Sequence, residues 1–340
     1  KMEKIINIDW LSFFCQCGDI VNFDNYTLEV KNYGTQIFEK MADVIKYNEV
    51  VAIVLWQPRS EILQKDSAMI KIKNRQLYNG KWYQIFCDIQ QNWFCRDIKI
   101  SRIDICADFL TFKNGLHPKT LISNFLTQKF VKVGRGTFKV MGNQKKYINY
   151  QYLRFGSGAS DISAYLYNKS AEMREVRDKP YIRELWQNLK NSNNRDVWRL
   201  EFSLKGKSLK IVDTIQGNFV IDSFKSLTDK EVIANIFSFM VKKYFSFVIP
   251  ECQKNKSRWQ KLVLFNNEDC HFKIVDFRLK SDTTKKHKVF LTNLVALEKE
   301  MRALKSYARD IIQCVAQDYA EEHNLIDYVE RKKQLVKHFD

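Results

Sequence analysis

Apolar and polar positions alternate in short runs over the first two thirds of the chain, and this pattern is typical of β-strands. Apolar runs at 50–55 and 82–87 predict strands within the first hundred residues, with one helix over 35–47. Asn79-Gly80 has the composition of a hairpin turn. Further strands are predicted at 98–112, 147–155, 162–167 and 197–204, with a helical stretch over 170–191. Strands and helices do not alternate regularly, so the pattern indicates an α+β protein.

The last part of the chain has a different, helical pattern. Apolar residues recur there at alternating spacings of three and four: Leu294, Leu297, Met301, Leu304, Ala308, Ile311 and Val315. Such a heptad seam pairs with another helix. Two interpretations stay open: the seam joins two copies in a homodimer, or it packs against its own domain.

The distribution of charge divides the chain into three parts. The net charge is +17 and the pI is about 9.4. Residues 1–98 hold 12 basic and 12 acidic residues, 99–250 hold 26 and 13, and 251–340 hold 18 and 14. The basic excess predicts a polyanionic partner. On charge alone, nucleic acid, a ribosome, an anionic membrane surface or no specific partner all stay open.

Composition also bears on the compartment. No run of about 18 apolar residues occurs, so no membrane span is expected. The start of the chain lacks the apolar stretch of a secretion signal. Eight cysteines occur without a Cys-x-x-Cys pair. We therefore expect a cytoplasmic protein with reduced thiols.

Three of the predicted strands each carry one apolar and one polar face, because side chains alternate along a strand. The polar faces hold Arg102, Asp104, Cys106 and Asp108; Ser163, Tyr165 and Tyr167; and Arg199, Glu201 and Ser203. If the strands share a sheet, carboxylates gather there beside a phenol. Carboxylate oxygens suit Mg²⁺ or Mn²⁺. The alternative is an ordinary solvated face of a half-exposed sheet.

Spacing restricts the choice of metal ligands. Asp104 and Asp108 are four residues apart, which separates their Cα atoms by about 13 Å on a regular strand. One ion cannot readily bind both carboxylates. Asp104 with Glu201 is therefore the favoured inner pair, and Asp108 is an outer partner, or the ligand if Asp104 is structural.

Missing motifs exclude several other classes of site. The five histidines form no His-x-His pair, so nicking enzymes that hold a metal with a His-hydrophobic-His pair are excluded. A Gly-rich loop ending in Gly-Lys-Ser/Thr is also missing, which argues against an NTP-driven motor. Paired Cys/His zinc spacings are absent.

Four segments, in order, resemble the Rep-trans family of plasmid rolling-circle replication initiators. Residues 101–109 resemble the family's Thr-Arg-Leu-Asp-x-x-x-Asp strand, and 164–169 with Glu172 resemble its Ile-Tyr-Asn-Lys-Lys-x-Glu segment. Residues 197–205 resemble its Trp-Arg-x-Glu-x-x-Leu-Lys strand, and 255–259 its Asn-Ser-Arg-Thr-Lys-Tyr stretch. The resemblance spans roughly 95–310. Residues 8–12 also fit the opening strand of phage and conjugative-element relatives. Ser170 departs from the pattern, where the family has a second lysine.

The resemblance implies a nicking core of antiparallel sheets, followed by a helical C-terminal region for DNA recognition or dimerisation. It makes Tyr167 the nucleophile, helped by Lys169 and by Arg102 and Arg199 as phosphate clamps. Attack on one strand of origin DNA would leave a 5′-phosphotyrosine and a free 3′-hydroxyl, with Asp104, Glu201 and Asp108 as the metal-ligand set. DNA contacts are expected from Lys256, Arg258, Trp259 and Lys261.

Other expectations concern partners and alternatives. A host helicase and a DNA polymerase would follow the nick, and a homodimer is compatible with the seam. Two rival functions stay open: a relaxase that nicks a mobile element for conjugative transfer, and a DNA-binding protein without enzymatic activity.

Overall fold

The structure is a computed structural model of the 340-residue chain. It describes residues 3–134, 136–144, 148–190, 195–221, 223–251, 259–266, 271–275, 290–291, 316–321 and 326. The chain forms two compact units, residues 1–275 and 276–340. The described part of the second unit is helical, with Leu291, Ala316 and Ala320 buried. The heptad seam at 294–315 lies outside the described residues.

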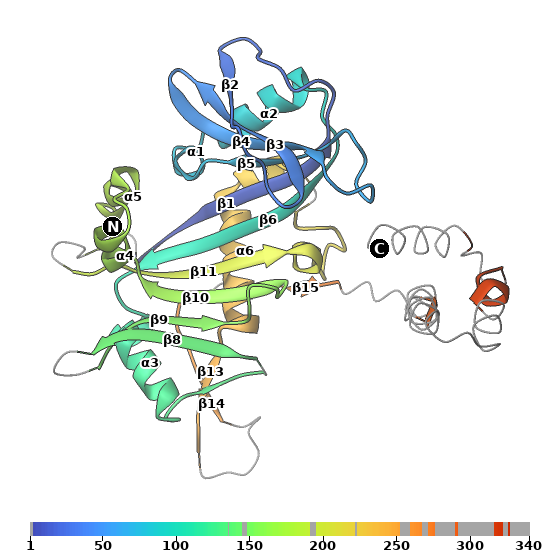
Figure 1. Cartoon of the computed structure of the whole chain (residues 1–340). Helices are drawn as coiled ribbons and strands as arrows, with labels where there is room; N and C mark the ends of the chain where they lie inside the picture. Colours follow the sequence, from blue (N-terminus) through green and yellow to red (C-terminus); the bar gives the residue numbers. More distant parts are fainter. Residues whose placement is uncertain are drawn as a thin grey trace. The chain divides into compact units, whose positions relative to one another are not determined.

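The first unit is built on one antiparallel sheet of ten strands, in the order β2-β3-β4-β5-β1-β6-β11-β10-β9-β8 (Figure 1). The strands are β1 Lys4–Gln16, β2 Tyr26–Val30, β3 Phe38–Lys46, β4 Glu49–Pro58, β5 Ser67–Ile72, β6 Arg96–Phe109, β8 Phe138–Gln144, β9 Ile148–Phe155, β10 Ile162–Asn168 and β11 Trp198–Lys205. Sheet and helices segregate as an α+β fold, as predicted. The long strands β1 and β6 pair with each other at its centre, and the predicted boundary at residue 98 falls inside β6.

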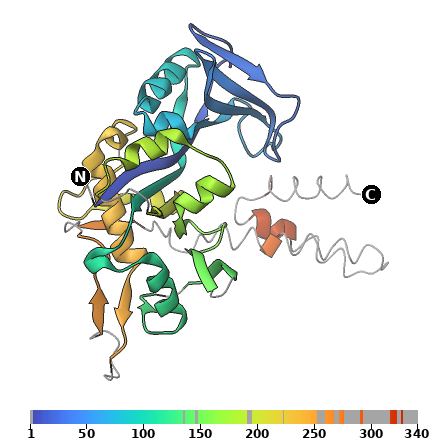
Figure 2. The same ribbon diagram turned by 90° about the vertical axis from the view of Figure 1, so that its left-hand side faces the viewer.

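Helices lie on both faces of this sheet (Figures 1 and 2). They are α1 Asn74–Tyr78, α2 Trp82–Asn92, α3 Pro118–Leu126, α4 Lys169–Glu175, α5 Pro180–Trp186 and α6 Lys230–Tyr244. On one face, α6 packs against β1 and β6 and buries Ile236, Phe237 and Met240 in the main core. The opposite face carries the polar side chains, and α1 and α5 supply partners to them through Tyr78 and Trp186.

Short elements complete the first unit. The strand pair β12 Ile211–Asp213 and β15 Phe272–Ile274 forms one small sheet; β7 Val131–Lys132, β13 Phe247–Ile249 and β14 Gln260–Leu262 form another. Three 3₁₀ turns are η1 Lys113–Gly115, η2 Gly206–Leu209 and η3 Lys225–Thr228. In the described part of the chain, no helix has the length and apolar content to cross a membrane.

Two sequence predictions in the first hundred residues are wrong. The expected helix over 35–47 is strand β3, whose Ala42 and Val44 are buried alternately in the core. The adjacent residues Tyr47 and Asn48 both have positive φ (51° and 60°), which is the backbone of a tight hairpin turn between β3 and β4. The last residue of the expected helix, Tyr47, is therefore part of the turn that joins β3 to β4.

The predicted strand at 82–87 is instead the start of helix α2. Trp82, Ile85, Phe86 and Ile89 are its buried residues, at helical spacings of three and four. A six-residue window is too short to separate this period from that of a buried strand. Asn79-Gly80 accordingly links α1 to α2 rather than two strands, with φ +71° at Gly80. The stretch 170–191 is helical as predicted, although it is divided into α4 and α5.

Candidate active site

The polar faces of β6, β11 and β10 meet in register, as the alternation predicts. Across β11 and β6, Arg199 pairs with Asp108 and Ser203 with Asp104. Across β10 and β11, Tyr167 pairs with Arg199 and Tyr165 with Glu201. The side chains predicted to carry chemistry therefore lie on one face of one sheet, on three neighbouring strands.

Tyr167 and Glu201 are directly joined. The Tyr167 hydroxyl donates a hydrogen bond to Glu201 Oε2 at 2.9 Å, and both side chains are partly exposed. Burial, together with the charges of Asp9 and Asp104, raises the pKa of Glu201 to about 7. A carboxylate with that pKa is suited to accept a proton at neutral pH. Burial and the Glu201 charge also raise the pKa of the Tyr167 phenol well above its ordinary value, so the phenol is protonated in the resting site.

Lys169 approaches the same tyrosine from the start of a helix. The strand ends at Asn168, whose side-chain oxygen caps helix α4 by accepting from the Ala171 N–H at 2.9 Å. Lys169 is thus the first residue of a helix rather than a strand residue. Its ammonium nevertheless lies 5.5 Å from the centre of the Tyr167 ring and 2.6 Å from Glu172 Oε2, with only 2% of the side chain exposed. A positive charge at this place favours a phenolate.

Asp104 and Arg102 form a second pair farther along β6. Arg102 Nε donates to Asp104 Oδ1 at 2.8 Å, and Nη2 donates to Oδ2. Burial raises the pKa of Asp104, and the Arg102 charge opposes that rise. Asp104 is 2% exposed, whereas 30% of the Arg102 side chain is in contact with solvent.

Two cationic side chains lie over the Trp10 ring, beside this pair. The guanidinium of Arg102 lies 4.4 Å from the centre of the Trp10 ring, and the Lys71 ammonium lies 3.3 Å from it. Burial, followed by the charges of Lys73 and Arg102, lowers the pKa of Lys71 to about 8. Sequence reasoning missed Lys71, which lies near the end of the interior strand β5 with no motif around it.

Arg199 has a structural position that does not suit a phosphate clamp. Its side chain is fully buried and donates to Asp108 twice, Nε to Oδ1 at 2.6 Å and Nη2 to Oδ2 at 2.8 Å. Its Nη1 donates to Asp9, and the Trp186 indole occupies Asp108 Oδ2 as well, at 2.8 Å. With these partners in place, Arg199 does not reach solvent, and Asp108 is engaged by Arg199 rather than open to an ion.

Asp9 is the main site residue that sequence reasoning did not assign. The register of β1 on β6 shifts between Ile8 and Trp10, and Asp9 occupies this irregularity. It accepts from Arg199 and from the Tyr78 hydroxyl, the latter at 2.7 Å. Burial alone would raise the pKa of Asp9, but the Arg199 and Lys169 charges outweigh it and hold the pKa well below its ordinary value. Residues 8–12 fit the opening strand of the relatives named above, but no local pattern in them predicts that the Asp9 side chain points into the site.

The carboxylates offer the oxygen donors that a hard cation prefers, but their oxygens are not already arranged around one point. In the part of the chain that the structure describes, no three of them bring their oxygens together as a closed metal-binding group. Glu201 and Asp104 are two oxygen donors whose mutual repulsion contributes to the raised pKa of Glu201. Carboxylate oxygens of this kind are the donors that Mg²⁺-type cations use together with water and substrate phosphate, although Arg102 holds both oxygens of Asp104 in this structure.

Two pockets with more basic than acidic residues open near the sheet. One, of about 820 Å³, is lined by four basic residues, Lys73, Arg75, Arg177 and Lys179, and by three acidic ones, Glu49, Asp178 and Glu184. Its Tyr181 hydroxyl donates at 2.7 Å to Asn74, whose amide in turn donates to the Asp9 backbone oxygen at 2.6 Å. The basic side chains of this pocket suit backbone phosphates of DNA.

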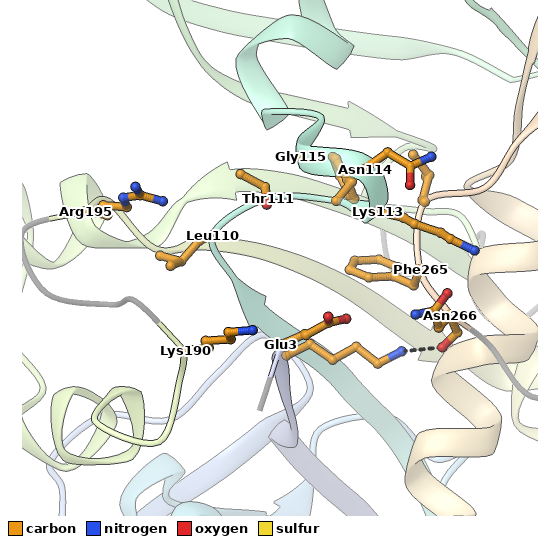
Figure 3. Close-up of a pocket in the computed structure, with 13 residues that line it drawn as sticks. Glu3, Leu110, Thr111, Lys113, Asn114, Gly115, Lys190, Arg195, Phe265 and Asn266 are labelled. Atoms are coloured by element: carbon orange, nitrogen blue, oxygen red, sulfur yellow. Dashed lines mark hydrogen bonds between the residues drawn. The ribbon is translucent and has the colours of Figure 1, made fainter. Parts of the chain in front are cut away.

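The other pocket, of about 710 Å³, lies where β1 begins and β6 ends (Figure 3). Lys113, Lys190 and Arg195 line it, with Glu3 among them. It is bounded by Phe265 and includes the Lys4 ammonium, which donates to the Asn266 backbone oxygen at 3.3 Å. Its cations make it a second place for phosphate contacts.

The predicted DNA-contacting stretch is only partly described. Lys256 and Arg258 lie outside the described residues. Trp259 is partly exposed, and Lys261 is exposed on β14, where it pairs in register with Val248 of β13.

Comparison with solved structures gives three matching chains, and one of them is described below. No family model and no curated protein matches the chain. The solved structure is titled "Structure of Rolling Circle Replication Initiator Protein from Geobacillus stearothermophilus"; it shares 14% sequence identity, and the match covers 76% of this chain and 92% of that chain with a TM-score of 0.47. A similarity of this size concerns the path of the chain and assigns no role to any residue.

Proposed function

We propose that the chain is a DNA-nicking enzyme that starts rolling-circle replication, with Tyr167 as its nucleophile. The observation that carries this proposal is the hydrogen bond from the Tyr167 hydroxyl to Glu201, a carboxylate whose pKa is raised to about 7 by burial and by neighbouring acidic charges. A phenol bonded to a base of that pKa, beside the Lys169 ammonium, has what a tyrosine nucleophile requires. The family resemblance of residues 164–169 identifies the same tyrosine.

The proposed reaction is a transesterification, in which one phosphate ester bond forms and another breaks. The Tyr167 proton passes to Glu201 while the phenolic oxygen attacks the scissile phosphorus. The P–O3′ bond breaks, the phosphate stays on Tyr167 as a 5′-phosphotyrosine, and the O3′ takes up a proton to become a free hydroxyl. The energy of the broken diester remains in the covalent link, so ATP is not needed. The 3′-hydroxyl would then serve a polymerase as primer, after a host helicase has opened the duplex.

Positive charge near the phosphate is required because the transition state gains negative charge. Lys169 is placed to stabilise the Tyr167 oxygen, and Arg102, partly exposed over Trp10, is placed to contact the phosphate. Lys71 adds a third cation on the same face. Arg199 is assigned instead to holding Asp108 and Asp9, and through them the polar face of the sheet.

Glu201 and Asp104 are the residues that would hold Mg²⁺ or Mn²⁺. Glu201 uses Oε2 for Tyr167, which leaves Oε1 for a cation. When bound, the cation would supply a Lewis acid that polarises the scissile phosphate.

Asp104 and Asp108 are both held by an arginine, but the two arginines differ in exposure. Arg199, on Asp108, is fully buried, so Asp108 is not proposed as a ligand. Arg102, on Asp104, is 30% exposed, so in the proposal it moves to the substrate phosphate and frees Asp104 for the cation.

The test is a nicking assay on a supercoiled plasmid that carries the cognate origin, with Mg²⁺ or Mn²⁺. The wild-type chain is expected to give open circles that keep covalently attached protein after denaturation. Tyr167→Phe should lower adduct formation on the order of 10³-fold or more, because the nucleophile is removed. Tyr165→Phe is the matched control: it removes a phenol from the same strand face and should retain the adduct.

Two results would refute the assignment. A covalent adduct that survives Tyr167→Phe but not Tyr165→Phe would move the nucleophile by two residues. An absence of nicking by the wild-type chain on every origin plasmid tried, together with tight origin binding, would favour a DNA-binding protein without enzymatic activity.

A further inference from the structure

Three buried cysteines meet at the opposite end of β1 and β6 from Asp108. Cys15 and Cys17 flank Gln16, the last residue of β1, and Cys95 directly precedes Arg96, the first residue of β6. Gln16 and Arg96 are register partners. Because side chains alternate along extended backbone, the three neighbours of this pair all point to the other face. The cysteines are 3%, 4% and 8% exposed.

The sulfur atoms are unusually close for thiols that only fill a core. Cys15 Sγ and Cys17 Sγ are 3.2 Å apart, and Cys17 Sγ and Cys95 Sγ are 3.4 Å apart. All three lie within 4.8 Å of one another. A disulfide would need a separation of about 2.05 Å. Three sulfurs bound to one tetrahedral zinc at about 2.3 Å each would be separated by roughly 3.8 Å. The observed spacing is near the second value.

The backbone around the cluster is fixed on several sides. The Cys17 N–H donates to the Asp66 backbone oxygen at 2.9 Å, and the Gly18 N–H donates to the Trp93 backbone oxygen at 2.8 Å. The Cys95 N–H donates to the Gln90 backbone oxygen at 2.9 Å. These bonds place the end of β1 against the segment that joins α2 to β6, so the three sulfurs are held in position without a metal.

We propose that Cys15, Cys17 and Cys95 form a site for a thiophilic cation, with Zn²⁺ as the expected occupant. Thiolates select Zn²⁺ or Cu(I) over the hard cations that carboxylates bind. Binding converts three thiols and one Zn²⁺ into a tris-thiolate complex with net charge −1 and releases three protons. A water molecule completes the tetrahedron, as in three-ligand zinc sites. The ion would tie together the end of β1, residue 17 and the start of β6.

The site is distinct from the candidate active site. It shares no residue with the active site. Arg102 pairs in register with Ser12, which is three residues from Cys15 on β1, or about 10 Å along the strand, and whose side chain points to the opposite face. We therefore expect a structural ion whose removal lowers the melting temperature, and a site whose failure would leave the nicking proposal untouched.

The first measurement needs no variant. The untagged full chain, purified with a reductant and without added metal, is expected to contain close to one equivalent of zinc by elemental analysis. Replacement of the zinc by Co²⁺ should give the intense near-ultraviolet charge-transfer absorption of cobalt-bound thiolates. Chelation should lower the melting temperature of the chain, and added Zn²⁺ should restore it.

Variants then identify the ligands. Cys17→Ala, at the centre of the cluster, should abolish stoichiometric metal binding and the cobalt-thiolate absorption, and Cys15→Ala and Cys95→Ala should do the same. Cys87→Ala is the matched control, since Cys87 is a partly buried cysteine on α2 outside the cluster. It should retain the full equivalent.

Three outcomes would overturn the proposal. One is a reduced wild-type chain that takes up neither zinc nor Co²⁺. Another is a disulfide between two of the three cysteines in protein purified under anaerobic, reducing conditions. The third is Cys17→Ala that retains one equivalent of metal with the cobalt-thiolate absorption intact.

Discussion

The two polar clusters on β1 and β6 differ in how they satisfy their buried groups. Toward one end, Asp9 and Asp108 are balanced by Arg199, so opposite charges and hydrogen bonds offset the loss of water. At the other end, the sulfur atoms of three cysteines lie within 4.8 Å of one another. The same pair of strands thus supports an ion-pair network and a sulfur cluster.

The comparison shows where each site can take a cation. In the carboxylate region, Glu201 is partly exposed, and Arg102, which holds both oxygens of the buried Asp104, is 30% exposed. In the cysteine region, the three side chains are only 3%, 4% and 8% exposed. The carboxylate region is therefore the more accessible of the two to a substrate.

The largest expected effect tests whether Arg199 is structural. Arg199→Met should destabilise the fold by about 3–5 kcal/mol, because it leaves the buried Asp108 charge without its partner. Urea denaturation of the variant and the wild type measures the difference. The double variant Arg199→Met with Asp108→Leu should be less destabilised than Arg199→Met alone. A loss below about 1 kcal/mol in the single variant is what a surface pair would give, and it would contradict a buried role.

Asp104 gives the next largest effect and tests the carboxylate region as the open metal site. Asp104→Asn should weaken Mn²⁺ binding and nicking at low Mn²⁺ by about 10–100-fold, with partial recovery at high Mn²⁺. Calorimetric titration and the nicking assay measure the two changes. Asp43→Asn serves as the control, because Asp43 lies on β3 and pairs with Lys31. It should leave Mn²⁺ binding and nicking unchanged. Equal Mn²⁺ affinity in Asp104→Asn and wild type would remove Asp104 from the site.

What the sequence alone predicts depends on whether a feature comes from a local pattern or from contacts between distant segments. The polar faces of β6, β10 and β11 follow from alternation within each strand, which is a local property, so the sequence places Tyr167, Glu201 and Asp104 on those faces, and their roles stay predictions. Their meeting on one face needed the register between strands. Helix α2 is mispredicted because six apolar-rich residues fit the 3.6-residue repeat of a helix and the two-residue repeat of a strand equally well.

Other features depend on contacts that no local pattern records. Asp9 points into the site because of an irregularity where β1 pairs with a strand about a hundred residues away. Cys95 meets Cys17 across 78 residues, so a search for Cys-x-x-Cys spacings could not find the cluster. The partners of the buried Arg199 likewise lie on two other strands, Asp9 on β1 and Asp108 on β6, and not on its own strand.

A pH profile tests the base assigned to Glu201. Proton acceptance needs the carboxylate, and the pKa of Glu201 is raised to about 7. Single-turnover nicking should therefore fall about tenfold per pH unit below 7 and level off above it. A saturating divalent ion should move this midpoint to lower pH, because a nearby positive charge favours the carboxylate. A profile that stays flat from pH 5 to 8 would exclude Glu201 as the base.

The smallest expected effect is a gain in stability at the expense of activity. The pKa of Glu201 is about 7 in the folded chain against an ordinary value of 4.5, so its charged form is disfavoured by folding. The stabilising contribution of this group is therefore present below pH 4.5 and is lost as the pH rises through 7.

Glu201→Gln keeps the shape and removes the charge, so it should raise the melting temperature by a few °C at pH 8 without divalent ions. The gain should vanish near pH 4, where wild-type Glu201 is protonated, and it should shrink when Mg²⁺ neutralises the carboxylate in the wild type. Thermal denaturation at both pH values measures it. A Glu201→Gln chain that is less stable than wild type at pH 8 would mean that the hydrogen bond from Tyr167 outweighs the burial of the charge.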